Sequence, residues 1–354
     1  MLKTAPWLTK NASTHERTPS LCRRFAVACC RGSILAFLAI PSLIGNPGAA
    51  SSGYVSPFFQ RVWQSEQGLP HDSVQAIVQT RDGYIWIGTR RGVERFDGTR
   101  FVKLEMSGAT RENISSLHED RNGSLWIGTA KGVARLQNGK LSLYGPAQGV
   151  PEDDVRTLYE DREGAVWIGR AGGLTQFKNG TFRNFTNKEG LASNVVRSVC
   201  EDEVGTLWIA TDNGLCCMKD GSISTPEMAK PLGRGVRVIA LDSEKHLWVG
   251  TQAGLFRRTE SGWEHFDKNQ NGLSDDFIDM IYSDRSGKFW IGTYGGLNRL
   301  VDGKFVTELT SEGTAYDLVN CMFEDREGDI WVGSKEGLAR LREKPFVALT
   351  KQDV

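Results

Sequence analysis

The residues of this chain that could bind a ligand recur shortly after seven regularly spaced tryptophans. They are Arg90, Arg91, Lys131, Arg170, Asp212, Tyr294 and Lys335. The set is mostly cationic, which suits an anion, and its tyrosine offers a flat face on which a ring can stack. We therefore predict that these residues bind a small anionic or carbohydrate-like ligand. The alternative is a solvated rim that carries ordinary surface charges.

Residue types that perform catalysis do not form a recognisable constellation in this sequence. The four histidines of the main part of the chain, which occupy non-equivalent positions without metal-ligand spacing, are His71, His118, His246 and His265. No nucleophile elbow, phosphate-binding loop or dinucleotide fingerprint is present. Recurring turn aspartates stand alone in their repeats, whereas a calcium ion needs six to eight oxygens in one place. We predict no catalytic residue, no metal and no cofactor.

The elements that must position the candidate residues repeat along the chain. The tryptophans are Trp86, Trp126, Trp167, Trp208, Trp248, Trp290 and Trp331, at intervals of 40 to 42 residues. A sustained period in this range is typical of solenoids and propellers. Each repeat contains four short apolar or alternating runs that are separated by glycine-containing turns. The sequence therefore predicts an all-β fold, a seven-bladed β-propeller of four-stranded antiparallel blades, with no helix.

Three local features of the repeat carry their own predictions. We expect the tryptophans to pack between neighbouring blades, and the turn aspartates to make local hydrogen bonds. The turn between the first and second strands contains a glycine in six repeats, whereas the fifth has Lys245-His246 and should form a different turn. Cys200, Cys216, Cys217 and Cys321 lack the spacing of a disulfide framework, so we expect small buried apolar residues.

Two loops of each repeat should meet on one face of the ring, near the central channel. One loop joins the second and third strands and holds the candidate ligand-binding residues. The other precedes the first strand and carries Asp72, Glu112, Asp153, Asn194, Arg234, Asp276 and Asp317. Loops on a rigid scaffold are common binding sites. Histidines with acidic residues at this face would favour an enzyme, for which His71 is the candidate, whereas a cationic and aromatic face would favour a sensor.

The two ends of the chain differ from the repeats. Residues 1–50 combine arginines, an apolar run and Gly48-Ala49-Ala50, which predicts a secretory signal peptide and a periplasmic or secreted protein. Residues 51–354 form the propeller, with repeats at roughly 74–350 and an extra strand at 58–64. Both 58–64 and 346–349 read as a fourth strand of the last blade, and ring closure favours the first.

Bulk composition excludes some partners. The formal net charge is zero, which argues against nucleic-acid binding. No segment after residue 58 is apolar for long enough to span a membrane.

The repeated phrase Glu-Asp-Arg-x-Gly-x-Leu-Trp-Ile-Gly-Thr-x-x-Gly-Leu-x-Arg-Leu resembles the two-component regulator propeller repeat over residues 58–350. Arg170, Ser334 and Ala210 depart from it. The resemblance implies a periplasmic sensor domain of a hybrid two-component system, here stand-alone or truncated, without membrane or kinase parts of its own. A protein-interaction scaffold that binds a protein partner or a second copy is the alternative. A lyase or hydrolase is another, since streptogramin lyases have a similar build.

Overall fold

A computed structural model describes residues 56–103, 112–308 and 316–345. The chain divides into a unit of residues Met1–Gly53 and a unit of residues Tyr54–Val354, and every described residue belongs to the second. The predicted signal peptide and the strand expected at 346–349 lie outside the described residues.

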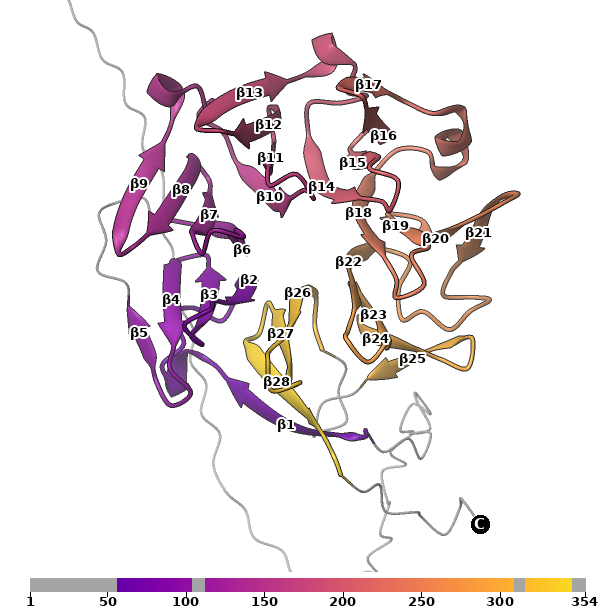
Figure 1. Ribbon diagram of the computed structural model, residues 1–354. Helices are drawn as coiled ribbons and strands as arrows, with labels where there is room; N and C mark the ends of the chain where they lie inside the picture. The colour runs from indigo at the N-terminus through magenta and orange to yellow at the C-terminus, as the bar shows by residue number, and fades with distance from the viewer. Residues whose placement is uncertain (1–55, 104–111, 309–315, 346–354) are drawn as a thin grey trace, which may run out of the picture. The chain divides into compact units, whose positions relative to one another are not determined.

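The second unit is a ring of seven four-stranded antiparallel sheets, which confirms the predicted propeller (Figure 1). The first strands of the blades, nearest the centre, are β2 (Val74–Gln79), β6 (Ile114–Glu119), β10 (Val155–Glu160), β14 (Val196–Glu201), β18 (Val236–Leu241), β22 (Ile278–Ser283) and β26 (Val319–Glu324). The second strands are β3 (Ile85–Thr89), β7 (Leu125–Thr129), β11 (Val166–Arg170), β15 (Leu207–Thr211), β19 (Leu247–Thr251), β23 (Phe289–Thr293) and β27 (Ile330–Ser334).

Two further strands complete each blade on its outer side. The third strands are β4 (Gly92–Phe96), β8 (Gly132–Gln137), β12 (Gly173–Lys178), β16 (Gly214–Lys219), β20 (Gly254–Thr259), β24 (Gly296–Val301) and β28 (Leu338–Glu343). The fourth strands are β5 (Phe101–Lys103), β9 (Lys140–Tyr144), β13 (Thr181–Phe185), β17 (Ser222–Ser224), β21 (Gly262–Phe266), β25 (Lys304–Glu308) and, in the seventh blade, β1 (Phe58–Trp63).

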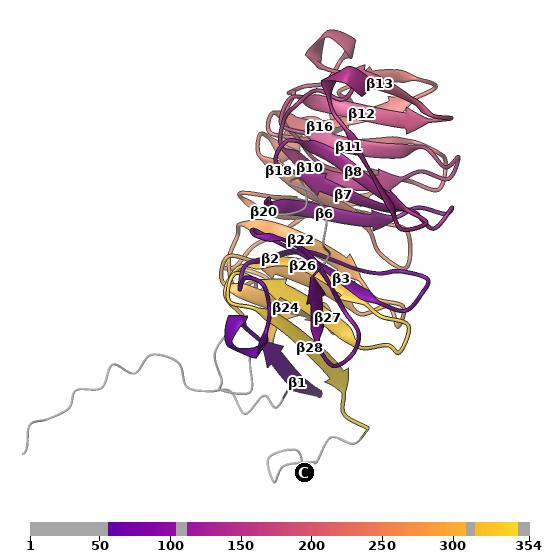
Figure 2. The same ribbon diagram turned by 90° about the vertical axis from the view of Figure 1, so that its left-hand side faces the viewer.

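The amino-terminal strand closes the ring. β1 pairs antiparallel with β28 from Phe58 opposite Glu343 to Trp63 opposite Leu338, and the two strands lie side by side in Figures 1 and 2. The Trp63 ring stacks on Trp331 with centroids 5.4 Å apart. The strand therefore covers an edge of the last blade that would otherwise offer unpaired backbone groups.

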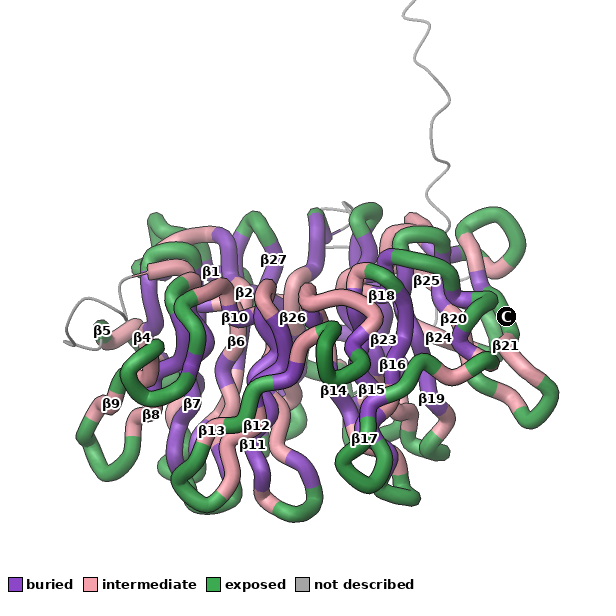
Figure 3. The backbone as a smooth tube through the Cα atoms, turned by 90° about the horizontal axis from the view of Figure 1, so that it is seen from above, coloured by how far each residue is buried: buried purple, intermediate pink, exposed green. Residues whose placement is uncertain are grey.

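The core lies between the blades, where the second strands are completely buried (Figure 3). Trp167, for example, shares one apolar cluster with Leu207 and Ile209 of the next blade. Each tryptophan also makes a hydrogen bond that the sequence analysis missed: the indole N–H of Trp126 donates to Asp120 Oδ2 at 2.8 Å. The other oxygen of Asp120 accepts two backbone N–H groups of the turn, so one carboxylate holds both turn and tryptophan.

The turn aspartates therefore make the local hydrogen bonds that were predicted for them. In the first blade a threonine replaces the aspartate, and Trp86 donates to the Thr80 hydroxyl at 2.8 Å. The prediction for the fifth blade was wrong, because its turn has the same hydrogen bonds as the others, with Lys245 at the left-handed φ of 70° that glycine adopts elsewhere. Backbone pairing on both sides imposes this conformation on a residue that disfavours it.

The expectation of no helix was also wrong. Short 3₁₀ helices follow several fourth strands, namely η1 (Ser65–Gln67), η3 (Pro146–Gln148), η4 (Asn187–Glu189) and η5 (Glu227–Leu232). Helices of one or two 3₁₀ turns have no hydrophobic period, so the sequence pattern does not reveal them. Among the residues that the structure describes, no helix combines the length and the hydropathy of a membrane span.

An arginine beside the turn aspartate connects most blades to the next one. Arg121 of blade 2 donates to both Glu160 carboxylate oxygens, and to the Asp161 and Arg162 carbonyls, all in blade 3. Arg81, Arg162, Arg285 and Arg326 make equivalent bonds to the following blade. We call this arrangement the arginine clamp. Arg326 joins blade 7 to blade 1 and so completes the ring.

The four cysteines of the described residues are free thiols. Cys200 and Cys216 are buried, as expected, whereas Cys217 and Cys321 are half-buried. Burial raises the pKa of the Cys200 thiol to about 12, so this group is neutral at physiological pH.

Candidate functional site

Each first strand contains a β-bulge directly after its first residue, and the bulged residue lies at the centre of the ring. The bulged residues, one in each blade, are Gln75, Ser115, Arg156, Arg197, Arg237, Asp279 and Asn320. The residue before each of them is a fully buried valine or isoleucine. A bulge leaves its extra residue unpaired and redirects the side chain. All seven line one cavity of about 240 Å³, which we call the channel site.

Ion pairs balance the three arginines of the channel site. Arg237 Nε donates to Asp279 Oδ1 at 2.6 Å, on the neighbouring first strand. Arg197 pairs with Asp212, with Nη2 and Oδ2 3.1 Å apart. Arg156 Nη2 lies 3.3 Å from Asp154 Oδ2. The site therefore contains both hydrogen-bond donors and hydrogen-bond acceptors. It is not the purely cationic and aromatic surface that would have favoured a sensor over an enzyme.

Two buried polar atoms of the channel site lack a hydrogen-bond partner among the described residues. They are Asn113 Oδ1, an acceptor, and Arg156 Nε, a donor. A buried polar group without a partner costs roughly 1–3 kcal/mol. A bound molecule that offers one donor and one acceptor would satisfy both atoms, which makes this part of the cavity suited to a hydroxyl-bearing ligand.

Two of the residues predicted from the sequence adjoin the channel site. Asp212 reaches it through its ion pair with Arg197. The Tyr294 ring, 47% exposed, lies against Phe277 with centroids 4.0 Å apart. The guanidinium of Arg237 lies 4.3 Å from the Phe277 ring, so Tyr294, Phe277 and Arg237 form one stack at the cavity edge.

Four other predicted residues lie outside the cavity. Arg90, Arg91, Lys131 and Lys335 are exposed and do not line it. Lys131 Nζ donates to Glu112 Oε1 at 2.7 Å, a bond that raises the pKa of its ammonium group. These four residues lie on the exposed outer part of the loops that join the second and third strands.

Arg170 needs a correction, because it is not on an exposed rim. Its side chain is 1% exposed, and it donates to Asp153 Oδ2 at 2.6 Å and to Thr175 Oγ1 at 2.9 Å. Arg170 occupies the place of the usual threonine at the end of a second strand, so its side chain extends into the blade. It therefore stabilises blade 3 internally.

Residues of the loop before the first strand make the local hydrogen bonds that were predicted. Asp72, Asn194 and Asp276 each accept a backbone N–H group from a residue seven or eight positions earlier in the chain. His71 is half-buried, and its Nδ1 accepts the Ser73 N–H at 2.9 Å. None of the residues that line the channel cavity is a histidine.

A signal for the channel site was present in the sequence. Every first strand begins with a β-branched apolar residue, and a polar residue of changing type follows, as in Val74-Gln75, Val236-Arg237 and Ile278-Asp279. A position that is always polar within an apolar strand, yet is filled by five residue types over seven repeats, indicates a function other than folding. The prediction based on the loops did not include this position.

Several solved structures share this fold. The extracellular domain assigned to the hybrid two-component system BT3049 of B. thetaiotaomicron is 23% identical with a TM-score of 0.70, over 82% of this chain and 42% of that one. The corresponding domain of BT4673 is 21% identical with a TM-score of 0.67, over 83% and 40%. This chain therefore spans less than half of those domains.

Virginiamycin B lyase from Staphylococcus aureus also has this fold. It is 15% identical with a TM-score of 0.61, over 80% of this chain and 99% of the lyase. Identities at this level show a shared fold alone. No curated protein matches the sequence.

The repeats themselves identify the family. Six segments match the two-component regulator propeller, at residues 68–91, 109–131, 149–169, 190–213, 272–295 and 315–336. The matches recur in phase with the blades and cover their first turn and second strand. This chain belongs to the two-component regulator propeller family.

Proposed function

We propose that this protein is an extracytoplasmic binding propeller that senses a small anionic or carbohydrate-like ligand at the channel site. The observation that carries the proposal is the ring of seven bulged residues. They share one backbone position and are all polar, yet they belong to five residue types, with arginine in blades 3, 4 and 5 and a different polar residue in each of the other four blades. A constant scaffold with variable polar side chains at its centre is the arrangement of a recognition site.

The charges of the channel site favour a hydroxyl-rich acid over a bare inorganic anion. Each arginine already has a carboxylate partner, so an anion must compete with Asp154, Asp212 or Asp279. The same carboxylates accept hydrogen bonds from hydroxyl groups, while Gln75 and Asn320 both donate and accept. An acidic sugar offers a carboxylate for the arginines and hydroxyls for the remaining groups. Tyr294 adds a surface for its ring.

An extracytoplasmic location fits the proposal. Two-component regulator propellers of similar fold are extracellular domains, and residues 1–50 have the pattern of a signal peptide. Detection of the protein in the periplasmic or culture fraction, cleaved near residue 50, is the expected result of fractionation with amino-terminal sequencing.

Thermal unfolding of the purified protein tests the binding proposal. Galacturonate oligomers, neutral malto-oligosaccharides and inorganic phosphate are the probes. A ligand at about 100 times its Kd stabilises the folded state by about 2.7 kcal/mol, which raises Tm by several degrees. We expect the acidic oligomers to raise Tm, and Arg156→Ala to abolish the shift. Arg91→Ala on the exposed rim is the matched control and should retain it.

Other outcomes would overturn the proposal. No shift with any probe, or an unchanged shift in Arg156→Ala, would remove the channel site as the binding site. Conversion of an oligosaccharide during incubation would support the lyase or hydrolase alternative. The interaction-scaffold alternative has less support, since the exposed large apolar residues of the described ranges are spread over four blades: Phe59 and Val62 in blade 7, Leu143 in blade 2, Val204 in blade 4 and Tyr294 in blade 6.

A further inference from the structure

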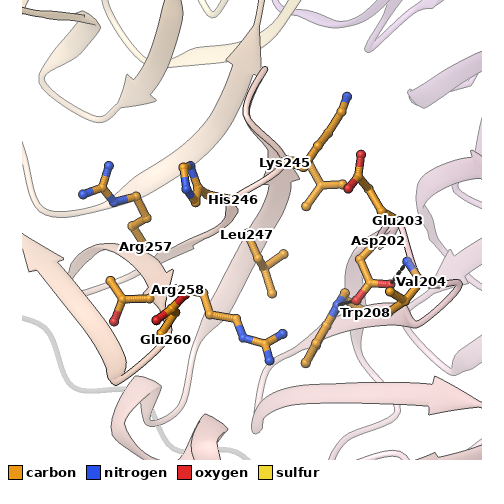
Figure 4. Close-up of a pocket in the computed structure, with 12 residues that line it drawn as sticks. Asp202, Glu203, Val204, Trp208, Lys245, His246, Leu247, Arg257, Arg258 and Glu260 are labelled. Atoms are coloured by element: carbon orange, nitrogen blue, oxygen red, sulfur yellow. Dashed lines mark hydrogen bonds between the residues drawn. The ribbon is translucent and has the colours of Figure 1, made fainter.

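A hollow of about 750 Å³ lies between blades 4 and 5, and we call it the blade 4–5 groove (Figure 4). It is lined by the turns between the first and second strands and by the end of β20. In an antiparallel blade these turns lie at the edge opposite the loops of the channel site. The groove is therefore separate from the channel site.

The arginine clamp is missing at this interface. The residue of blade 4 that corresponds to Arg121 is Glu203, and the residue of blade 5 that corresponds to its acceptor Glu160 is Leu241. Both partners of the clamp are replaced together. No guanidinium fills the space between these two turns, and both replacement side chains line the groove.

A second replacement changes the side chain that covers Trp208, the tryptophan of blade 4. Counted from the glycine that begins the third strand, or directly precedes it in blade 7, the fifth residue is apolar in six blades: Phe96, Leu136, Phe177, Met218, Leu300 and Leu341. In blade 5 this position is Arg258, whose guanidinium lies 5.4 Å from the Trp208 ring. Figure 4 shows it directed across the groove toward Trp208. No carboxylate forms an ion pair with Arg258 within the described ranges.

The interface between blades 5 and 6 shows that loss of the clamp does not by itself require an arginine. Ser243 and Ser283 replace the clamp residues there. Leu300 nevertheless remains at the fifth position of the third strand, in the apolar cluster that contains Trp248. Arg258 is thus specific to the blade 4–5 groove.

Lys245 gives independent support. It lines the groove and adopts a φ of 70°, where the other six turns have glycine. A left-handed conformation costs a residue other than glycine on the order of 1 kcal/mol. Strain of this kind often persists where a side chain has a role in binding. Like Arg258, the Lys245 ammonium has no ion-pair partner among the described residues.

We propose that the blade 4–5 groove binds a small organic acid that joins one carboxylate to an apolar body. The planar fork of Arg258 holds the carboxylate through two parallel hydrogen bonds, and Lys245 adds a second positive charge at the end of the groove. Leu241, Leu247 and the exposed Val204 contact the apolar body. Glu203 and Glu260 disfavour ligands with several negative charges and accept hydroxyl groups.

Isothermal titration of the full chain with four probes tests this proposal. Phenylacetate carries its carboxylate on an apolar aromatic ring, and galacturonate carries its carboxylate on a hydroxyl-rich sugar ring. Benzyl alcohol and galactose are their neutral counterparts. We expect phenylacetate to bind and benzyl alcohol to bind at least tenfold more weakly. Binding of galacturonate without phenylacetate would overturn the proposed apolar body, because a sugar ring carries hydroxyl groups.

Two variants locate the site by introducing residues that other blades already have at the same positions. We therefore expect both variants to fold. Arg258→Leu introduces the residue of blades 2, 6 and 7, and should weaken binding at least tenfold. The double variant Glu203→Arg with Leu241→Glu fills the groove with a clamp and should also lose binding. Ser243→Arg at the next interface is the matched control, and Arg156→Ala tests the channel site separately. Ser243→Arg should bind phenylacetate like the wild type.

The proposal is overturned by either of two results. One is that phenylacetate does not bind the wild-type protein at millimolar concentration. The other is that binding survives in Arg258→Leu and in the double variant. Binding that is lost in Arg156→Ala instead would assign the acid to the channel site.

Discussion

Blades 2 and 3 meet through a closed interface, whereas blades 4 and 5 meet through a groove. In the closed interface Arg121 clamps Glu160, and the Phe177 ring lies 4.9 Å from Trp126. In the groove the corresponding residues are Glu203, Leu241, Arg258 and Trp208. The strands, turns and tryptophan–aspartate bonds are the same in both. The blade 4–5 interface therefore lacks the clamp, as the blade 5–6 interface does, and in addition places Arg258 at a third-strand position that is apolar in the other six blades.

A further difference concerns the residue after the Trp-Ile pair. It is Gly128 in blade 2, where an added Cβ would lie 2.6 Å from Val155 Cγ1 of blade 3. In blade 4 it is Ala210, which is buried in one cluster with Val236 of blade 5. The interface between blades 2 and 3 thus has no room for an additional methyl group, whereas the interface between blades 4 and 5 accommodates the methyl group of Ala210.

The largest expected effect comes from removing the tryptophan of the closed interface. Trp126→Ala should lower the free energy of unfolding by about 4 kcal/mol, because it removes a fully buried ring and its bond to Asp120. Trp208→Ala should cost about 3 kcal/mol, since a guanidinium and not an aromatic ring covers Trp208. Denaturant unfolding of both variants measures the difference. Equal losses would contradict the view that the two interfaces are packed differently.

A smaller effect is expected from adding one methyl group. Gly128→Ala should destabilise the protein by about 2 kcal/mol, because Val155 must move to admit the new Cβ. Ala210→Gly is the reverse change in blade 4 and should cost about 1 kcal/mol through lost burial and a more flexible unfolded chain. Thermal unfolding of the pair checks the order. A neutral Gly128→Ala would mean that the closed interface relaxes more easily than its geometry indicates.

The smallest effect is expected from the clamp itself. Arg121→Ala should cost about 1 kcal/mol, because its side chain is 48% exposed and solvent weakens its ion pair with Glu160. Glu203→Ala is the matched change in blade 4, where no clamp exists, and should alter stability by less than about 0.5 kcal/mol. Urea unfolding at low and high salt measures both. Only the Arg121 variant should lose part of its effect at high salt.

Much of the fold could be predicted because propeller geometry repeats in the chain. The spacing of Trp86 through Trp331 indicated seven blades, and glycines such as Gly83 and Gly164 marked turns that do have positive φ. The exceptions are local. The Lys245 turn kept the common conformation because backbone pairing on both sides outweighs the preference of one residue. The 3₁₀ helices were too short to produce a hydrophobic period in the sequence.

The candidate binding residues were harder to predict, because their type does not reveal where their side chains lie. Arg170 ends a second strand and Arg91 follows one, and both are cationic, yet Arg170 is buried against Asp153 and Arg91 is exposed. Arg237 was not selected, although its bulge directs it into the channel site. A bulge of one residue decides this, and its mark in the sequence lies in the first strands and not in the loops from which the candidates were chosen.

The sequence by itself determined the family, the number of blades, the turns and the buried tryptophans, because each depends on residues close together in the chain. Only the tertiary structure decided which polar residues meet at the centre, which strand completes the last blade and where two blades leave a groove. These features join residues from different repeats, such as Arg237 with Asp279 and Phe58 with Glu343. Their contacts arise when the ring closes, since closure brings side chains together that no local pattern connects.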